Sequence, residues 1–353
     1  MTLQVFKTTG FRCLEEVALE PDPHLNLIFG PNASGKTSLL EAIYYLGRGR
    51  SFRASGNREL VRTGERQFTL FGEVSCADRV HKAGIEVESG ARRVRVDGEN
   101  ATGADLAAIL PVQAIDPEIH NLVQGGPEFR RRFLDWGVFH VKHSFLEEWR
   151  RYQQALRQRN ASLRMGEPDS AVSAWNAELA ASGEAVNALR SDYLELYLPL
   201  LSSIIDEKIP FDSKCSYRRG WKEGFSLAEA LVESLARDRA MGSTQVGPHR
   251  ADLALEVHDR RARYRVSRGQ QKLLAATMVI AQIRLIAEQG VSDLVLLVDD
   301  PAAELDRDNR RRLFDLLQDV PAQMFVTALE AEDLPWTSDG RMFHVEHGRL
   351  KQT

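Results

Sequence analysis

Residues 30–37 form the motif that most restricts what this chain can fold into. They read Gly-Pro-Asn-Ala-Ser-Gly-Lys-Thr and match the phosphate-binding loop pattern G-x-x-x-x-G-K-[ST]. The run 24–29 before the motif predicts a buried strand, and 38–46 after it predicts a helix with an apolar face. A glycine-rich turn between the two directs backbone N–H groups and the positive end of the helix dipole at one point. A polyphosphate fits there.

The motif also gives its residues individual roles. Lys36 is expected to reach the β- and γ-phosphates of ATP, and the Thr37 hydroxyl to bind Mg²⁺. The nucleotide-binding residues predicted in and next to the loop are Gly30, Pro31, Asn32, Ala33, Ser34, Gly35, Lys36, Thr37 and Ser38.

Two carboxylates follow the near-continuous apolar run 294–298, which is typical of a central strand covered on both faces. In phosphate-loop enzymes a carboxylate at the end of such a strand makes a second Mg²⁺ contact. We therefore predict that Asp299 holds the metal through water, and that Asp300 orients or deprotonates the attacking water. The alternative is a turn or capping pair, and the loop at 30–37 favours the catalytic interpretation.

Composition excludes several classes of protein. The 353 residues are 43% apolar and 27% charged, which is usual for soluble domains and enough for two or three of them. The sequence has no run of 18 apolar residues and no signal-peptide pattern, so we expect a cytoplasmic protein with no membrane partner. Cys13, Cys76 and Cys215 are far apart, which suits a reducing compartment and no zinc site.

The net charge of −4 does not by itself indicate nucleic-acid binding, but arginines are clustered. Such clusters follow phosphate backbones or form solvated faces. They lie at Arg48–Arg66, at Arg130–Arg132 and at Arg260–Arg268. Candidate DNA contacts in the first cluster are Arg48, Arg50, Arg53 and Arg58.

The chain changes character twice. Residues 1–110 read as strands around the loop, and 145–209 as an antiparallel helical pair broken at Met165–Pro168, with arms of about 30 Å or more. From about residue 251 the pattern returns to α/β, so the flanking halves are expected to form one domain. The strands expected there are Asp252–Val257, Ala262–Val266, Leu294–Val298 and Gln323–Thr327, and the helices Gln270–Gln289 and Asn309–Leu317.

A further motif, Ser267-Arg268-Gly269-Gln270, lies directly before the first of these helices. It resembles the signature motif of ABC-type ATPases. In that class a helix N-terminus binds the γ-phosphate of a nucleotide held in the phosphate-binding loop of another subunit. Ser267, Gly269 and Gln270 are the residues so implied. The segment 303–306, Ala-Glu-Leu-Asp, resembles the D-loop of the same class, which touches the partner subunit.

Longer segments resemble the bacterial recombination-mediator family RecF, in order and over essentially the whole chain. They are 117–135, 244–250 and 298–306, with Phe11-Arg12 and 50–53 near the N-terminus. The resemblance implies an α/β fold: an ABC-type, SMC-like head P-loop ATPase with an inserted helical arm domain. It divides the chain into an N-terminal ATPase part (1–112), the arm or second lobe (113–243) and a C-terminal ATPase part (244–353).

The resemblance also implies a function. It predicts an ATP-dependent homodimer that binds duplex DNA and gapped single-/double-strand junctions, and hydrolyses ATP slowly as a weak, DNA-dependent switch. RecR and RecO would be partners in loading RecA during recombination, replication, repair and the SOS response.

Four positions depart from the ABC or RecF pattern. Ala33 stands where the loop often has Gly, and Ala303 where the D-loop often has Ser. Asp300 is one methylene shorter than the usual Glu, which fits slow hydrolysis. Thr327 stands near where ABC proteins often have a switch histidine.

Three residues keep two interpretations each. Arg12 is a surface strand residue or a phosphate or ribose contact, and Gln113 a core residue or a metal-contacting glutamine at the lobe junction. His249 is a fold element with a satisfied imidazole, or lies near nucleotide or DNA. Two other functions compete: a transporter nucleotide-binding subunit, which the segment 117–135 and the arm disfavour, and a P-loop kinase, which needs no signature motif.

Overall fold

The computed structural model describes residues 3–54, 56–76, 79–258, 260–291, 293–335 and 340–352. The chain forms two compact units. The first comprises Met1–Ile119 and Ala276–Thr353, and the second comprises His120–Ala275. The sequence-based division into lobes at 112/113 and 243/244 stays a prediction. The compact units have different boundaries, since β8 (Val112–Ile115) pairs with a sheet of the first unit.

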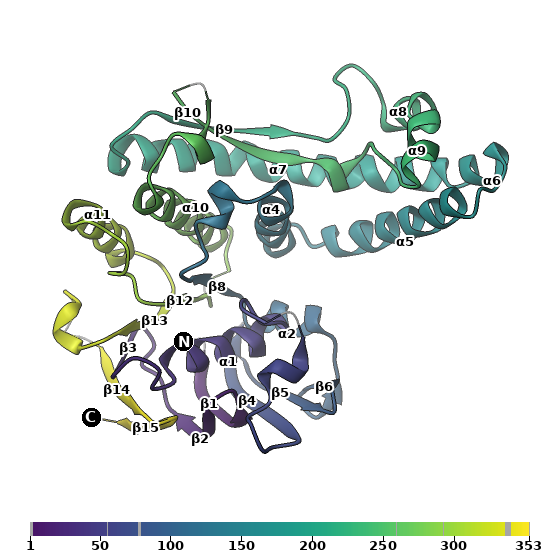
Figure 1. Ribbon diagram of the computed structural model, residues 1–353. Helices are drawn as coiled ribbons and strands as arrows, with labels where there is room; N and C mark the ends of the chain where they lie inside the picture. Colours follow the sequence, from purple (N-terminus) through teal and green to yellow (C-terminus); the bar gives the residue numbers. More distant parts are fainter. Residues whose placement is uncertain are drawn as a thin grey trace. The chain divides into compact units, whose positions relative to one another are not determined.

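The first unit contains two six-stranded sheets with helix α1 (Lys36–Arg48) between them (Figure 1). Every residue of α1 from Ser38 to Gly47 is buried, as expected for a helix covered on all sides. One apolar cluster joins α1 to strands of both sheets, including Phe6, Phe68, Val295 and Phe325. The phosphate-binding loop is therefore followed by a helix fixed on every side.

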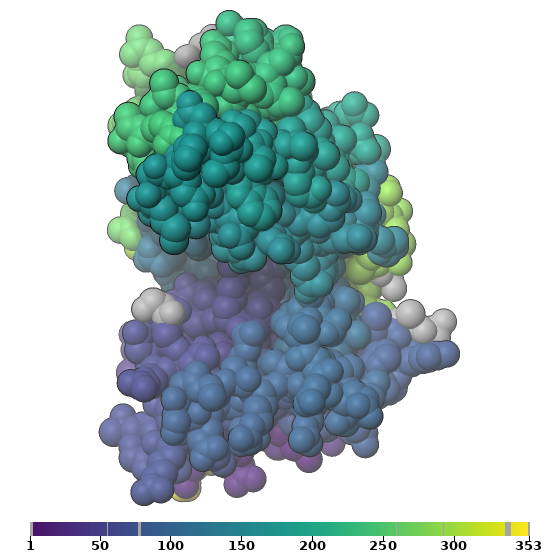
Figure 2. Space-filling model, turned by 90° about the vertical axis from the view of Figure 1, so that its right-hand side faces the viewer, coloured from purple at the N-terminus to yellow at the C-terminus, as the bar shows by residue number. Residues whose placement is uncertain are grey.

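One sheet of this unit is antiparallel and has the order β2-β1-β4-β5-β6-β7. Its alternating buried and exposed residues are typical of a sheet with one face on the core. Its strands are β1 (Leu3–Phe11), β2 (Leu14–Leu19), β4 (Gln67–Cys76), β5 (Arg79–Glu88), β6 (Ala91–Val96) and β7 (Glu99–Asn100). In Figure 2 strands β4 to β7 of this sheet and helix α2 (Gly103–Ile109) belong to the region drawn in blue.

The other sheet has the order β15-β14-β3-β13-β12-β8. Its four central pairings, from β14 through β3, β13 and β12 to β8, are parallel, so their carboxyl ends share one edge. The strands, besides β8, are β3 (Leu25–Phe29), β12 (Val295–Val298), β13 (Gln323–Ala328), β14 (Arg341–Glu346) and β15 (Arg349–Gln352). Helix α11 (Arg307–Gln318) connects β12 to β13. This edge carries the loop at 30–37 after β3 and the carboxylates after β12.

The second unit is mainly helical. Helices α5 (Phe145–Arg164) and α7 (Asn176–Lys208) pack along each other, with the short α6 (Asp169–Ser173) between them in sequence. This confirms the predicted helical pair and its break after Arg164. The remaining elements are α3 (Asn121–Gln124), α4 (Pro127–Val141), α8 (Leu227–Glu233), α9 (Leu235–Met241), and the sheet of β9 (Ser213–Arg218), β10 (Asp252–Val257) and β11 (Arg260–Arg261).

The predicted strand 262–266 is wrong. Only Arg260 and Arg261 pair with β10, and Ala262–Tyr264 forms a 3₁₀ turn. Arg263, Tyr264 and Arg265 are all exposed, so this run lacks the alternation of buried and exposed side chains that holds a strand on a sheet, and helix α10 (Arg268–Glu288) begins soon after it. The other strands and helices expected after residue 251 are present, with no end more than two residues from its expected position.

No helix among the described residues is long and apolar enough to cross a membrane.

Candidate nucleotide-binding site

The backbone of the loop at 30–37 requires glycine at two positions. Gly30 and Gly35 have φ of 148° and 117°, in the region that residues with a Cβ rarely adopt. A Cβ on Gly30 would also lie 2.2 Å from the Val345 carbonyl oxygen. Ala33 has φ of 61°, so the methyl group that the sequence places there costs on the order of 1 kcal/mol of backbone strain.

Two polar groups of the loop indicate an anion ligand. The Ser34 hydroxyl is buried and forms no hydrogen bond within the described part of the chain. Lys36 Nζ donates to the carbonyl oxygens of Gly30 and Pro31 at 2.6 and 3.0 Å. Burial lowers the pKa of Lys36, and the negative charges of Asp299 and Asp300 oppose that shift. The two carbonyl oxygens are neutral acceptors for this ammonium group. Phosphate oxygens would accept stronger, charge-assisted hydrogen bonds from it.

Thr37 and Asp299 meet at the end of β12, although 262 positions separate them. Thr37 Oγ1 lies 2.9 Å from Asp299 Oδ2 and 3.1 Å from Oδ1. Burial raises the pKa of Asp299; hydrogen bonds from Thr327 and Thr37 and the charge of Arg53 lower it. A hydroxyl and a carboxylate are oxygen ligands that Mg²⁺ accepts. The described residues contain no group of three His, Cys, Asp or Glu able to hold a metal, so phosphate and water would complete such a site.

Thr327 fixes the orientation of this carboxylate. Its hydroxyl donates to Asp299 Oδ1 at 2.8 Å and accepts from the Asp300 backbone N–H at 2.8 Å. Asp300 is exposed and has φ of 47°, so the chain turns sharply after the buried Asp299. The two neighbouring carboxylates therefore occupy different environments, as their different predicted roles require.

Arg12 is held in a buried network with Glu41 of α1. Its Nε and one terminal nitrogen donate to the two Glu41 carboxylate oxygens, each at 2.9 Å, and Glu41 is fully buried. The Ser51 hydroxyl also bonds Glu41 and accepts from the backbone N–H groups of Arg53 and Ala54. Sequence reasoning missed Glu41 and Ser51, because nothing in the motif points to a charge on a buried helix.

Beside this network lies an open hollow of about 640 Å³. Arg12, Ser38, Arg53 and Cys13 line it, and Cys13 Sγ lies 3.4 Å from Ser38 Oγ. Arg12 follows the last residue of β1 and is partly exposed, with its charge paired with Glu41, and its contact with a phosphate or ribose stays a prediction.

The four candidate DNA contacts differ in exposure. Arg50, Arg53 and Arg58 are exposed. Arg48 is partly buried with its guanidinium 5.5 Å from the centre of the Tyr44 ring, and burial lowers its pKa. Arg48 therefore packs against α1, whereas the other three reach solvent.

The signature-like motif begins helix α10. The Gln270 backbone N–H donates to Ser267 Oγ at 3.3 Å, and the Ser267 N–H donates to the Gln270 side chain at 2.9 Å. This reciprocal pair is a capping box. Ser267 is exposed, and Gly269 and Gln270 are partly exposed, so the N-terminus of a 21-residue helix reaches the surface of the second unit.

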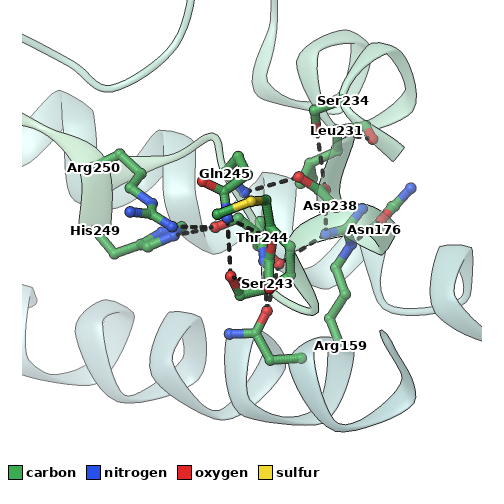
Figure 3. Close-up of polar contacts among 12 residues, drawn as sticks. Arg159, Asn176, Leu231, Ser234, Asp238, Ser243, Thr244, Gln245, His249 and Arg250 are labelled. Atoms are coloured by element: carbon green, nitrogen blue, oxygen red, sulfur yellow. Dashed lines mark hydrogen bonds and ion pairs between the residues drawn. The ribbon is translucent and has the colours of Figure 1, made fainter. Parts of the chain in front are cut away.

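Gln113 and His249 have structural partners. The Gln113 amide donates to Gln282 Oε1 at 2.6 Å inside the first unit. His249 Nε2 bonds the Thr244 carbonyl at 2.9 Å, so Nδ1 accepts from the Tyr152 hydroxyl at 2.5 Å. Figure 3 shows Thr244 and His249 beside the buried pair Arg159–Asp238.

The second arginine cluster is also partly structural. Arg130 pairs with Asp252 through two nitrogens, at 2.7 and 3.2 Å, and Arg131 donates to the Ala251 carbonyl at 2.7 Å. Both side chains join α4 to the start of β10, whereas Arg132 is exposed. A run of three arginines therefore contributes mainly to the interior of the second unit.

Comparison with known proteins shows which family the chain resembles. Residues 2–348 match the model of the RecF/RecN/SMC N terminal domain. DNA replication and repair protein RecF of Stutzerimonas stutzeri (strain A1501) is 42% identical over 361 residues, covering 100% of this chain and 98% of the relative. The chain belongs to the RecF family. The RecF of Azotobacter vinelandii (strain DJ / ATCC BAA-1303) is also 42% identical, over 362 residues covering 100% and 99% of the two chains.

Solved structures agree with the RecF assignment. A recombination mediator protein RecF described with ATP, in the RecFOR pathway, has a TM-score of 0.88 at 26% identity, covering 100% of this chain and 97% of that one. An Smc head bound to the C-winged helix domain of ScpA shares the fold, with a TM-score of 0.60 at 16% identity and coverage of 100% and 97%. The predicted α/β fold of an ABC-type, SMC-like head is thereby confirmed.

Proposed function

We propose that this chain binds ATP and Mg²⁺ and closes as a homodimer on duplex DNA beside single-strand gaps. The main support is the contact of 2.9 Å between Thr37 Oγ1 and Asp299 Oδ2. It brings together one oxygen from the phosphate-binding loop and one from the end of the central strand, next to a lysine that lies over the loop. This combination is the one that phosphoryl-transfer sites use.

The chemistry is divided among few residues. The backbone N–H groups of the loop and Lys36 bind the β- and γ-phosphates. Bound Mg²⁺, held by Thr37 and Asp299, would neutralise charge on the phosphate oxygens. Asp300 accepts the proton of the attacking water. Asp300 is a short carboxylate on a sharp turn, so hydrolysis is slow and the protein acts as a switch.

The second half of the site comes from a second copy of the chain. The exposed capping box Ser267–Gln270 presents a helix N-terminus, which favours the negative γ-phosphate held by the other copy. ATP then bridges the two copies, and its hydrolysis releases them. A relative described as a recombination mediator in the RecFOR pathway supports RecO and RecR as partners. RecA loading is the outcome that we propose for this assembly.

The substitution Ser267→Arg tests this dimer. It should leave ATP affinity within about twofold but abolish ATP-dependent dimerisation, because an arginine blocks the face of the helix N-terminus. Light scattering with size exclusion, with and without ATP and a gapped duplex, measures the dimer. Ser203→Arg, on an exposed position of α7, is the matched control and should dimerise normally.

Lys36→Ala is the second control, because it should lose ATP binding and the dimer together. An ATP-dependent dimer of wild-type strength in Ser267→Arg would contradict the composite site. Release of phosphate to water, rather than transfer to an acceptor, separates this function from a kinase.

A further inference from the structure

Helix α11 carries an exposed polar surface that is separate from the nucleotide site. Its inner face is buried through Leu313, Leu316 and Leu317. Its outer face carries Arg307, Arg310 and Arg311, all exposed. A spacing of three and four residues puts side chains on one side of a helix, so the three guanidiniums are neighbours.

These guanidiniums border a hollow of about 310 Å³ in the first unit. Phe314, the next residue along the same stripe, and Pro335 add an apolar wall, and Asp315 and Gln318 complete the lining. The hollow therefore combines several positive groups with one apolar surface. Its lining includes no residue of the loop at 30–37 and none of the carboxylates after β12.

The three guanidiniums are not paired directly with a described carboxylate, although Asp315 lines the same hollow. None of Arg307, Arg310 and Arg311 forms an ion pair or side-chain hydrogen bond with a described residue. By contrast, the buried Asp299 and Glu41 of the same unit are fully engaged. Like charges three or four residues apart on a helix repel one another, and an anionic ligand removes that repulsion.

We propose that the outer face of α11 is a docking site for an acidic segment of a partner protein that also carries an apolar side chain. Carboxylates match guanidinium geometry in bidentate pairs. An apolar side chain, best an aromatic one, fits against Phe314 and Pro335. The site is separate from the nucleotide site, so the failure of one proposal does not affect the other.

Duplex DNA fits this surface less well than an acidic segment does. Asp308, Asp315 and Asp319 are exposed on or just after the same helix and limit the positive surface to the three guanidiniums, which is too short a stretch for a phosphate backbone to follow. The apolar wall adds nothing to the binding of phosphates. Both features favour a short ligand with localised carboxylates and one apolar group.

The test uses the full chain and a fluorescein-labelled 12-residue peptide with six Asp and a C-terminal Phe. Fluorescence anisotropy should show saturable binding to the wild type. The double variant Arg310→Ala with Arg311→Ala should bind at least about tenfold more weakly, since each lost charge-assisted contact is worth that much. Arg93→Ala with Arg95→Ala, which removes two exposed arginines from β6, should bind within twofold of wild type.

Two companion probes identify the chemistry. A peptide with Asn in place of every Asp should lose binding, and one ending in Ala should bind several-fold more weakly. A thermal melt and ATP titration of the α11 variant should match wild type. The proposal is overturned if the wild type does not bind the acidic peptide, if the α11 variant binds it normally, or if that variant loses duplex affinity while keeping peptide affinity.

Discussion

Thr327 is the residue on which the two carboxylates after β12 depend. One hydroxyl donates to Asp299 and accepts from the Asp300 N–H, so it orients the first side chain and fixes the backbone turn that carries the second. The hydroxyl also opposes the rise in the pKa of Asp299 that burial causes. Sequence alone suggested only that Thr327 stands near the position of a switch histidine.

Thr327→Val removes this hydroxyl at almost constant volume. The buried N–H and carboxylate it leaves unpaired should cost about 1–3 kcal/mol of unfolding free energy. The pKa of Asp299 rises further, so less of the carboxylate is ionised as pH falls. Affinity for ATP with Mg²⁺, measured by calorimetry from pH 8 to 6, should drop more steeply towards low pH than in wild type. Thr327→Ser should restore both properties; an unchanged pH profile in Thr327→Val would assign the hydroxyl to folding alone.

Among the elements, the helical arm is held by buried charges as well as by apolar contacts. Arg159 pairs with Asp238 at 2.7 Å with neither side chain exposed, and Arg190 pairs with Asp135 while lying over the Trp149 ring. His249 joins this interior through Tyr152 and through the carbonyl of Thr244 (Figure 3). Burial lowers the pKa of His249 to about 4, so the ring is neutral at neutral pH.

This neutral ring makes the arm sensitive to acid. The unfolded chain binds the proton near pH 6.5 but the folded chain only near pH 4, so stability present above pH 6.5 is lost as pH falls between the two values. From pH 7.5 to 5 this amounts to about 2 kcal/mol. Urea unfolding should show that loss in wild type and in the surface variant His143→Gln, but a clearly smaller one in His249→Gln. The same pH dependence of the unfolding free energy in all three proteins would contradict this prediction.

The elements that sequence predicts well are those whose pattern is local. The strand–loop–helix at 25–48 and the apolar strands β12 and β13 follow from short-range periodicity. β9 was missed because its alternating residues, Ser213 to Arg218, include few apolar side chains. The contacts Thr37–Asp299 and Arg12–Glu41 join distant segments, and no local pattern specifies them.

For the whole molecule, the exposed arginines after α1 connect the nucleotide site to DNA in the proposed function. Arg53 lies close enough to Asp299 for its charge to lower the pKa of that carboxylate. Arg50 and Arg58 are exposed in the same segment. A single short segment thus lies near the Asp299 carboxylate and also reaches solvent.

Arg50→Ala with Arg53→Ala should weaken duplex binding and reduce the slope of log affinity against log salt by up to about 2, since each phosphate contact contributes about 0.9. Fluorescence titration of a labelled duplex at several salt concentrations, with ATP present, measures the slope. The pair Arg93→Ala and Arg95→Ala removes the same charge elsewhere and should keep the wild-type slope. If the two double variants give the same salt slope, the arginines after α1 form only a solvated face.

The network around Glu41 couples three positions that are separated in the sequence. One buried carboxylate receives Arg12 from the end of β1 and Ser51 from beyond α1, so three separated positions share a single pair of oxygens. Removing Arg12 leaves a buried negative charge that only Ser51 contacts, and removing Glu41 takes the carboxylate from both of its partners, so the effects of substitutions at these positions should not add. Positions 12, 41 and 51 therefore act as one energetic unit that ties the end of β1 to the segment after α1.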